Sequence, residues 1–317
     1  YTDFDVSTIV SILRSFFGST ATIKQINPSG KFGTAHVIYF VEMGDGSQYV
    51  FRANCGVGPP EIAMMAEKLI ADRLTAASIP VNHVLFADIS RTRYPFDYQI
   101  VEMMDHGDIE LTFTGTKEAY DQLSYELGTL IAKLGMVKTE GFGRWTLKGV
   151  EQGNLIGNKS RMSDYVSVCV HEDARHLADA EVISNTLVDR LDGLFQTYAI
   201  YINEGKPSIV HHDLADHNLM TDGKSITAIF DWEASISGDN VLDLASCPTW
   251  KTIYPREALL LAGYKSTAPL PRYFEEKYRI YLLRTLLWKT AYALKREAMS
   301  EERKAKLYTA MEPFGLS

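Results

Sequence analysis

The spacing of apolar residues in the first hundred positions predicts a sheet accompanied by two helices. Residues 5–18 carry apolar side chains at helical intervals, and Gly18 marks the end of that helix. A second helix is predicted at 59–77, where proline is tolerated in the first turn. One strand is predicted before the segment 27–36, and others at 35–43, 48–54, 82–89 and 98–104. A small antiparallel unit with one main helix is therefore expected at this end of the chain.

Beyond Met104 the apolar spacing becomes that of amphipathic helices. Helices are predicted at 120–137, 181–202 and 272–297, and short strands are expected to interrupt them between Ser208 and Glu233. In the second helix one stripe collects Ile183, Leu187, Leu191, Leu194 and Tyr198. The expected fold class is α+β with two lobes. The smaller, nucleotide-binding lobe is placed at 1–105, and the larger, mostly helical lobe with catalytic and substrate-binding residues at 106–317.

The composition fits a folded protein of the cytoplasm. Apolar residues make up 46% of the 317 positions, which is enough for a sizeable core. The net charge of −8, without a basic stripe, argues against nucleic-acid binding. No run of about 18 uncharged apolar residues predicts a membrane span. The scattered cysteines Cys55, Cys169 and Cys247 lack a C-x-x-C pair, which fits a reducing compartment. We expect a cytoplasmic monomer that binds neither nucleic acid nor a membrane.

The densest cluster of polar side chains lies between Ser208 and Glu233. Its spacing is H-x-D-x-x-x-x-N, which contains Asp213 and Asn218, and a strand that ends on Asp231 follows. Phosphoryl transfer needs a carboxylate at the acceptor hydroxyl, and an amide oxygen and a second carboxylate to hold Mg²⁺. The spacing therefore favours that chemistry.

Two other interpretations of the cluster stay open at this point. A metal-hydrolase site would use His211, His212, Asp213 and His217, but it would need ligands from a further segment. A polar loop without chemistry would explain any one of these residues, but not their joint spacing.

The stretches VHHDLADHNLM, AIFDWE and SGDNVLDLAS together resemble the aminoglycoside phosphotransferase family. Its members are relatives of the protein kinases that phosphorylate small molecules. YVFRAN and the segment around TEGFG look most like the hygromycin B phosphotransferase branch. The resemblance implies a bilobal, protein-kinase-like fold. It also implies that Asp213 is the catalytic base and that Asn218 and Asp231 bind Mg²⁺ on ATP.

The resemblance assigns structural roles to two further residues of this region. His211 would brace the loop by hydrogen bonds, and Asp243 would cap backbone amides near it. His212 and Asp216 occupy positions that vary in the family, and Asp216 is expected to be solvated or to cap a backbone amide.

The resemblance places ATP binding in the first lobe, with GTP as an alternative nucleotide. Ser29, Gly30 and Gly33 lie in NPSGKFGTAH, whose backbone N–H groups would cover the phosphates. Arg52 stands where the family carries a phosphate-binding lysine, and an arginine differs from lysine in reach and geometry. Glu67 would form the family's ion pair, with Glu61 as the alternative. Glu102 and Met104 would meet adenine through backbone groups.

The acceptor is expected to be a small cation, most simply an aminoglycoside. The interval between Asp231 and Asp243 leaves no room for a peptide-binding platform. Strand alternation would turn Glu233 to the same face as Asp231, so that Glu233 and Asp213 would both meet the acceptor. Further acids stand at Glu172, Asp173 and Asp179. A kinase of choline, a sugar or a peptide antibiotic is the second hypothesis, and a nucleotide-binding module without turnover is the third.

Overall fold

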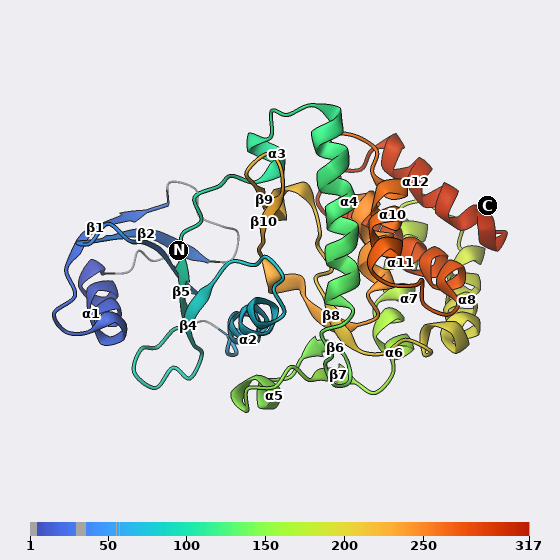
Figure 1. The fold of residues 1–317 in the computed structure, drawn as a ribbon. Coiled ribbons are helices and arrows are strands. Elements are labelled where there is room, and N and C mark those ends of the chain that lie inside the picture. Colours follow the sequence, from blue (N-terminus) through green and yellow to red (C-terminus); the bar gives the residue numbers. More distant parts are fainter. Residues whose placement is uncertain (1–4, 30–35, 55, 57, 317) are drawn as a thin grey trace.

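The computed structural model describes residues 5–29, 36–54, 56 and 58–316. An antiparallel sheet with two helices forms one part of the chain, and a mostly helical assembly forms the other (Figure 1). The predicted α+β fold with a sheet-rich N-terminal part and a helical C-terminal part is confirmed.

The sheet has five strands in the order β1-β2-β3-β5-β4, and every neighbouring pair is antiparallel. Helix α1 follows the N-cap Asp5 and packs Ile9 and Leu13 into a core shared with Phe51 of β3. Helix α2 packs against β4. The strands and helices of this part are β1 Ile23–Pro28, β2 Val37–Met43, β3 Gln48–Ala53, β4 Val84–Asp88, β5 Tyr98–Glu102, α1 Val6–Phe17 and α2 Ile62–Ala76. Their order is the predicted one.

Helices dominate the remainder of the chain, and two of the three predicted there lie close to the expected ranges. The third, α8, begins at Thr186 instead of at residue 181, so Ile183 is buried ahead of the helix. Helices α7, α10 and α12 were not predicted. The α-helices of this part are α3 Ile109–Thr112, α4 Lys117–Leu134, α5 Leu147–Glu151, α6 Met162–Val166, α7 Val170–Asp179, α8 Thr186–Ile202, α9 Val241–Ser246, α10 Glu257–Thr267, α11 Phe274–Lys295 and α12 Glu301–Met311.

Short strands set the candidate loop among these helices. A four-stranded sheet has the order β7-β6-β11-β8, and β9 pairs with β10 in a hairpin. The strands are β6 Phe142–Trp145, β7 Gly157–Lys159, β8 Ser208–Val210, β9 Leu219–Thr221, β10 Ile226–Ile229 and β11 Ile236–Gly238; the 3₁₀ turns are η1 Asp216–Asn218, η2 Trp232–Ala234, η3 Cys247–Thr249 and η4 Glu312–Phe314. The interruption predicted between Ser208 and Glu233 is confirmed.

The end of this hairpin differs from the prediction. Strand β10 ends at Ile229, and Asp231 takes a left-handed backbone conformation with φ 61°. Glu233 therefore lies in the 3₁₀ turn η2 instead of continuing a strand. The strand alternation that was expected to align Glu233 with Asp231 is wrong.

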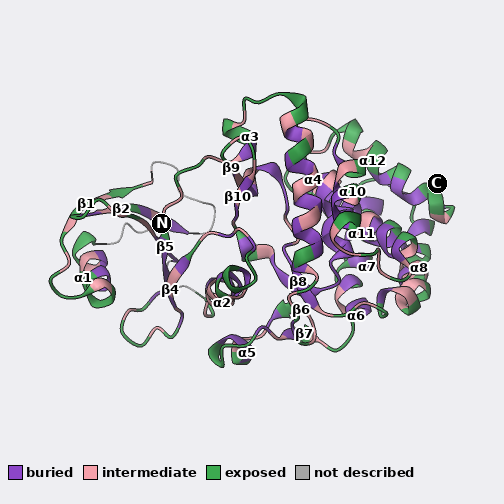
Figure 2. Ribbon diagram, viewed as in Figure 1, coloured by how far each residue is buried: buried purple, intermediate pink, exposed green. Residues whose placement is uncertain are grey.

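The main hydrophobic core is continuous from α2 into the helical part, where it includes residues of α4, α8, α9 and α11. Figure 2 shows buried positions gathered where these helices meet, with exposed residues on the outer turns. Because this core crosses residue 105, the division into 1–105 and 106–317 stays a prediction. No helix in the described part of the chain combines the length and apolar character needed to cross a membrane.

Helices α4 and α10 cross at a contact that only glycine permits. A Cβ atom added to Gly128 would lie 2.1 Å from the carbonyl oxygen of Leu260, and one added to Gly263 would lie 1.9 Å from that of Tyr125. The crossing matters for the candidate site because α4 also carries Tyr120, whose hydroxyl donates to Asp216 of the candidate loop.

We predict that Gly128→Ala lowers the free energy of unfolding by about 1–3 kcal/mol, because the two backbones must separate. Gly193→Ala in α8 is the matched control, since nothing lies within 4 Å of the added Cβ there. That substitution should raise stability by up to about 1 kcal/mol. Urea unfolding of the three proteins tests the crossing, and a Gly128→Ala protein as stable as the Gly193→Ala control would contradict it.

Candidate functional site

One buried carboxylate positions the start of the loop between β8 and β9. Asp243 accepts hydrogen bonds from the backbone N–H of His211 at 2.9 Å and of His212 at 2.7 Å. Burial raises the pKa of Asp243 to about 7, against the lowering effect of these two N–H groups. The predicted structural role of Asp243 as a cap for backbone amides is confirmed.

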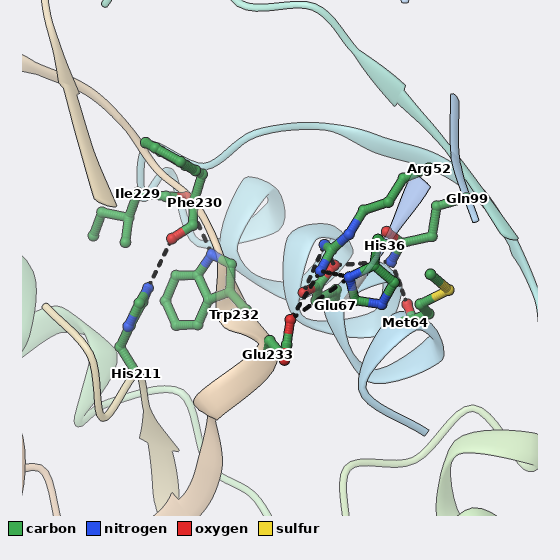
Figure 3. Close-up of polar contacts among 10 residues, drawn as sticks. All are labelled: His36, Arg52, Met64, Glu67, Gln99, His211, Ile229, Phe230, Trp232 and Glu233. Atoms are coloured by element: carbon green, nitrogen blue, oxygen red, sulfur yellow. Dashed lines mark hydrogen bonds and ion pairs between the residues drawn. The ribbon is translucent and has the colours of Figure 1, made fainter. Parts of the chain in front are cut away.

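His211 joins this loop to the end of the hairpin. Its Nδ1 accepts from the N–H of Asp213 at 3.2 Å, so the ring proton must sit on Nε2, which donates to the carbonyl of Phe230 at 2.9 Å (Figure 3). Burial lowers the pKa of His211 to about 4. The neutral ring packs on Trp232 at 4.4 Å between centroids. The predicted bracing role of His211 is confirmed.

Two residues of the site adopt left-handed backbone conformations that non-glycine residues avoid. They are His212 with φ 70° and Asp231 with φ 61°. Conformations of this kind cost about 1 kcal/mol or more and persist where surrounding contacts impose them. Here the N–H of His212 is held by Asp243, and the carbonyl of Phe230, next to Asp231, is held by His211.

Asp213 and Asn218 lie together on this loop. Asn218 Nδ2 donates to the carbonyl oxygen of Asp213 at 2.8 Å and to its Oδ2 at 3.2 Å. Asp213 Oδ1 is buried without a hydrogen-bond partner among the described residues. Burial raises the pKa of Asp213; nearby His217 lowers it and Asp231 raises it further. A buried carboxylate oxygen with raised basicity and no donor is what a proton acceptor requires.

The atoms left for a metal are oxygens. Since Nδ2 of Asn218 is committed to Asp213, its Oδ1 remains as the ligand atom. Among the described residues, the Asp231 carboxylate forms neither a hydrogen bond nor an ion pair. Amide and carboxylate oxygens are ligands that Mg²⁺ prefers. The two residues therefore fit the predicted metal, although their binding of Mg²⁺ stays a prediction.

The three histidines do not assemble a metal-hydrolase site. His211 bonds Phe230 and Asp213, His217 contacts Glu110 at 3.0 Å, and His212 packs between the rings of Tyr165 and Trp288. Within the described ranges no group of three or more His, Cys, Asp or Glu side chains is placed to hold a metal ion.

Asp216 differs from its prediction as a solvated or capping residue. It is buried, and its carboxylate accepts from Arg256 Nη1 at 2.5 Å and from the Tyr120 hydroxyl at 2.9 Å. Arg256 also donates to the carbonyl of Leu214. This ion pair anchors the candidate loop to the helical part. The residue is buried because a distant arginine meets it, a contact that no local pattern indicates.

Arg52 is the centre of a second polar network, which joins the sheet to the hairpin end. Its Nη1 lies 2.9 Å from Glu67 Oε2, and its Nη2 lies 3.1 Å from Glu233 Oε2 (Figure 3). Glu67 also accepts from Gln99 Nε2 at 2.9 Å. Burial alone lowers the pKa of Arg52, but the surrounding carboxylates raise it. The predicted pairing of Arg52 with Glu67 is confirmed, and Glu61 takes no part in it.

His36 belongs to this network, and the sequence did not single it out, although it ends the segment 27–36 that was predicted to cover the phosphates. Arg52 Nη2 can only donate, so His36 Nδ1 accepts its bond at 3.0 Å and the ring proton lies on Nε2. Burial lowers the pKa of His36 to about 3, so the ring is neutral. Its Nε2 is buried with no partner among the described residues, which leaves one N–H donor for a ligand.

A cavity of about 440 Å³, called here the sheet-side cavity, collects most of the residues predicted to bind nucleotide. Its walls include Ser29, Arg52, Glu102, Met104, Asp231 and Glu233. Glu67 stands behind Arg52 instead of in the wall. Gly30 and Gly33 lie outside the described residues. The contacts of all these residues with a nucleotide stay predictions.

The backbone at Met104 fits its predicted contact with a base. The N–H of Glu102 donates to His83 and that of Met103 to Gln48, whereas the N–H of Met104 makes no hydrogen bond within the described ranges. The Glu102 carboxylate points to His83 at 3.2 Å. The backbone N–H of Met104 is therefore a donor available to a ligand in the sheet-side cavity.

A second cavity of about 420 Å³, the helix-side cavity, holds Asp213 in its wall. Glu233 lines the sheet-side cavity and Ala234 the helix-side cavity, so both border on the same turn. The helix-side wall also contains Arg144, Tyr165, Trp250, Arg284 and Trp288, none of which was predicted as a site residue. Tyr165, Arg284 and Trp288 lie in segments that the sequence marked, but their convergence on one cavity arises only in the fold.

Lys289 contacts Trp250, one of the residues that line this cavity. Its Nζ donates to Thr249 Oγ1 at 2.7 Å and stands 3.1 Å from the centroid of the Trp250 ring. Burial lowers the pKa of Lys289 to about 6, although Asp213 raises it. Near neutral pH the side chain therefore carries little positive charge.

Comparison with known proteins gives matches over most of the chain. A profile of the phosphotransferase enzyme family matches residues 33–292. Hygromycin-B 4-O-kinase of Escherichia coli is 25% identical over 215 residues, which cover 65% of this chain and 57% of that enzyme. The chain thus matches little more than half the length of this relative. The predicted resemblance to hygromycin-type enzymes is confirmed.

Solved structures share the fold, and two of them illustrate the range. A thermostable variant of aminoglycoside phosphotransferase APH(4)-Ia, in a ternary complex with AMP-PNP and hygromycin B, superposes with a TM-score of 0.68 at 18% identity and covers 96% of this chain and 98% of its own. The macrolide 2′-phosphotransferase MphH of Brachybacterium faecium gives 0.59 at 15% identity, with 98% of each chain covered.

The contacts of His211 predict its protonation state. Nitrogen NMR should find a neutral ring with its proton on Nε2 from pH 8 down to near the pKa of about 4. Because this pKa lies below the ordinary 6.5, the linked stability is complete above pH 6.5 and is lost as the pH falls towards 4; it amounts to about 3 kcal/mol. The His211→Asn protein identifies the resonance. A ring that titrates near pH 6.5, or carries its proton on Nδ1, would contradict the bracing geometry.

Proposed function

The chain belongs to the phosphotransferase enzyme family, and on that premise we propose that it transfers the γ-phosphate of ATP to a hydroxyl group of a small molecule in the presence of Mg²⁺. One observation carries the proposal. Asp213, with an unpartnered buried carboxylate oxygen, lines one cavity, while Asp231 lines a second cavity that borders on the same turn. A donor and an acceptor bound in the two cavities would meet at these carboxylates.

In the proposed reaction the acceptor hydroxyl approaches Asp213 from the helix-side cavity. Asp213 orients the hydroxyl and takes its proton as the oxygen forms a bond to the γ-phosphorus. The bond between that phosphorus and the β–γ bridging oxygen breaks, and ADP leaves with the electron pair. Asn218 and Asp231 would hold Mg²⁺, which when bound would supply charge neutralisation at the phosphates. Orientation and proton transfer are the steps assigned to this chain's own side chains.

Nucleotide binding is assigned to the sheet-side cavity. We assign adenine to the backbone near Glu102 and Met104, and the phosphates to Ser29, Arg52 and the Nε2–H of His36. Arg52 keeps its geometry through the Glu67 ion pair, so Glu67 would act on the phosphates through Arg52. The AMP-PNP complex of the APH(4)-Ia variant supports ATP as the nucleotide, with GTP as an alternative.

The acceptor class is the less constrained part of the proposal. The names of the relatives support the aminoglycoside expected from the sequence, and the macrolide enzyme extends the range to other hydroxyl compounds. Kinases of choline, sugars or peptide antibiotics remain the second hypothesis. A binding module without turnover is the third, and the unpartnered Asp213 oxygen argues against it. The predicted contact of Glu233 with the acceptor has little support, because its carboxylate binds Arg52.

We expect Asp213→Asn to reduce phosphoryl transfer by about a hundredfold to ten-thousandfold while nucleotide affinity stays nearly unchanged. The amide keeps the shape of the side chain but cannot accept the proton, and the nucleotide contacts lie in the other cavity. Turnover is measured by ADP release with a responsive acceptor, and nucleotide affinity by calorimetry with AMP-PNP and Mg²⁺.

Asp189→Asn on the exposed face of α8 is the matched control, because it removes the same charge far from both cavities. It should leave turnover and affinity at the wild-type level. An Asp213→Asn protein with turnover near that of this control would remove the basis for the proposed function.

A further inference from the structure

The helix-side cavity has an excess of positive charge. Three cationic side chains, Arg144, Lys159 and Arg284, stand in its wall, and Asp213 is the acidic residue there. Arg284 is already engaged by the protein, since it donates to the carbonyls of Val166 and Val168 and to Asp173. In the described part of the chain neither Arg144 nor Lys159 forms an ion pair. Arg144 and Lys159 therefore stand beside the proposed site of phosphoryl transfer without an ion pair among the described residues, although Glu233, which binds Arg52, also interacts electrostatically with Arg144.

Apart from Asp213, the acids considered for contact with a cationic acceptor lie outside the wall of this cavity. Asp173 is buried against Arg284, and Glu172 and Asp179 are absent from the cavity wall. Glu233 lines the sheet-side cavity and binds Arg52. An acceptor with several ammonium groups would meet Arg144 and Lys159 with only Asp213 to balance them. Ammonium groups in the same cavity as these two side chains would be repelled by their like charge. Asp213 cannot fully offset this repulsion, because it must remain available to the acceptor hydroxyl.

Aromatic rings form the other part of the cavity wall. The imidazole of His212, neutral because burial lowers its pKa to about 3, lies 6.2 Å from the Tyr165 ring and 6.5 Å from the Trp288 ring, with the latter stacked at 24°. Trp288 is 38% exposed, unusually for its size, and Trp250 also lines the cavity. Flat surfaces of this kind bind planar or apolar groups. They would also attract a lone cation, but the neighbouring Arg144 and Lys159 oppose that.

We propose that the acceptor is an anionic hydroxyl compound with a planar or apolar portion, bound by Arg144 and Lys159 and by the rings of Tyr165, Trp250 and Trp288, and not a polycationic aminoglycoside. This inference rests on the proposed function, because it takes the helix-side cavity as the acceptor site. The acid group would pair with these two cations while the planar portion lies against the rings. The hydroxyl would then meet Asp213 at the border with the sheet-side cavity.

Three glycosides that differ only at C6 test the charge preference. They are the p-nitrophenyl glucuronide with a carboxylate, the p-nitrophenyl glucoside with a hydroxyl, and the 6-amino-6-deoxy glucoside with an ammonium group. Calorimetry in the presence of AMP-PNP and Mg²⁺ measures their affinities, with hygromycin B as the polycationic probe. We expect the glucuronide to bind about tenfold or more tightly than the ammonium glycoside, and the neutral glucoside to fall between them.

Charge-reversal variants assign that preference to the cavity. Arg144→Glu and Lys159→Glu should each remove the preference for the carboxylate. Lys148→Glu in α5 is the control, because it makes the same change in net charge at an exposed position outside the cavity wall and should preserve the preference. Thermal unfolding checks that the variants fold. If a charge-reversal variant does not fold, the neutral variant Arg144→Gln replaces it. Arg144→Gln should weaken glucuronide binding several-fold.

The results separate this inference from the proposed function. Hygromycin B or the ammonium glycoside binding as tightly as the glucuronide would overturn the inference, as would no binding of any glycoside or a preference that survives both reversals. These are binding measurements, so they leave phosphoryl transfer itself untouched. An absence of AMP-PNP binding, or ATP turnover indifferent to Asp213→Asn, would instead remove the proposed function, whatever the glycosides do.

Discussion

The geometry of the site depends on one buried carboxylate holding two consecutive backbone amides. Asp243 binds the N–H groups of His211 and His212, and this contact keeps His212 in a left-handed conformation that its side chain disfavours. The neutral ring of His211 then spans from Asp213 to the carbonyl next to Asp231. Each carboxylate assigned to chemistry is thus placed by a residue that touches no substrate. The left-handed backbone conformations of the loop are therefore maintained by the buried hydrogen bonds of Asp243 and His211.

A second constraint separates the two cavities by charge. On the sheet side Arg52 is neutralised by Glu67 and Glu233, and the Asp231 carboxylate stands free for a metal. On the helix side Arg144 and Lys159 form no ion pair among the described residues, and Asp213 is the acidic residue of the wall. Because Glu233 and Ala234 are adjacent, a single turn divides these environments. Under the proposed function, a nucleotide in the sheet-side cavity and an anionic acceptor in the helix-side cavity would meet at this turn. A metal at Asp231 would neutralise the first, and Arg144 and Lys159 the second.

The sequence predicted those features that are local along the chain. Alternating apolar residues gave the order of strands and helices before residue 105, and the H-x-D-x-x-x-x-N spacing gave Asp213 and Asn218. Contacts between segments far apart in the sequence could not be predicted from local patterns. Asp216 is buried because Arg256 meets it, and the aromatic wall arises where Tyr165 and Trp288 converge on His212. The Arg52–Glu67 pair was the exception, because family resemblance supplied its partner. The position of Glu233 was misjudged because the left-handed turn at Asp231 has no clear signal in the sequence.

Phosphorus NMR of the wild-type chain with ATP and a panel of hydroxyl compounds tests the central claim most directly. The panel should contain aminoglycosides, macrolides, and neutral and anionic glycosides. The account predicts that a phosphomonoester signal grows in step with ADP, and only when both Mg²⁺ and a responsive acceptor are present. Formation of inorganic phosphate alone, or nucleotide binding without any ADP, would contradict the claim that this chain transfers a phosphoryl group to a small-molecule hydroxyl.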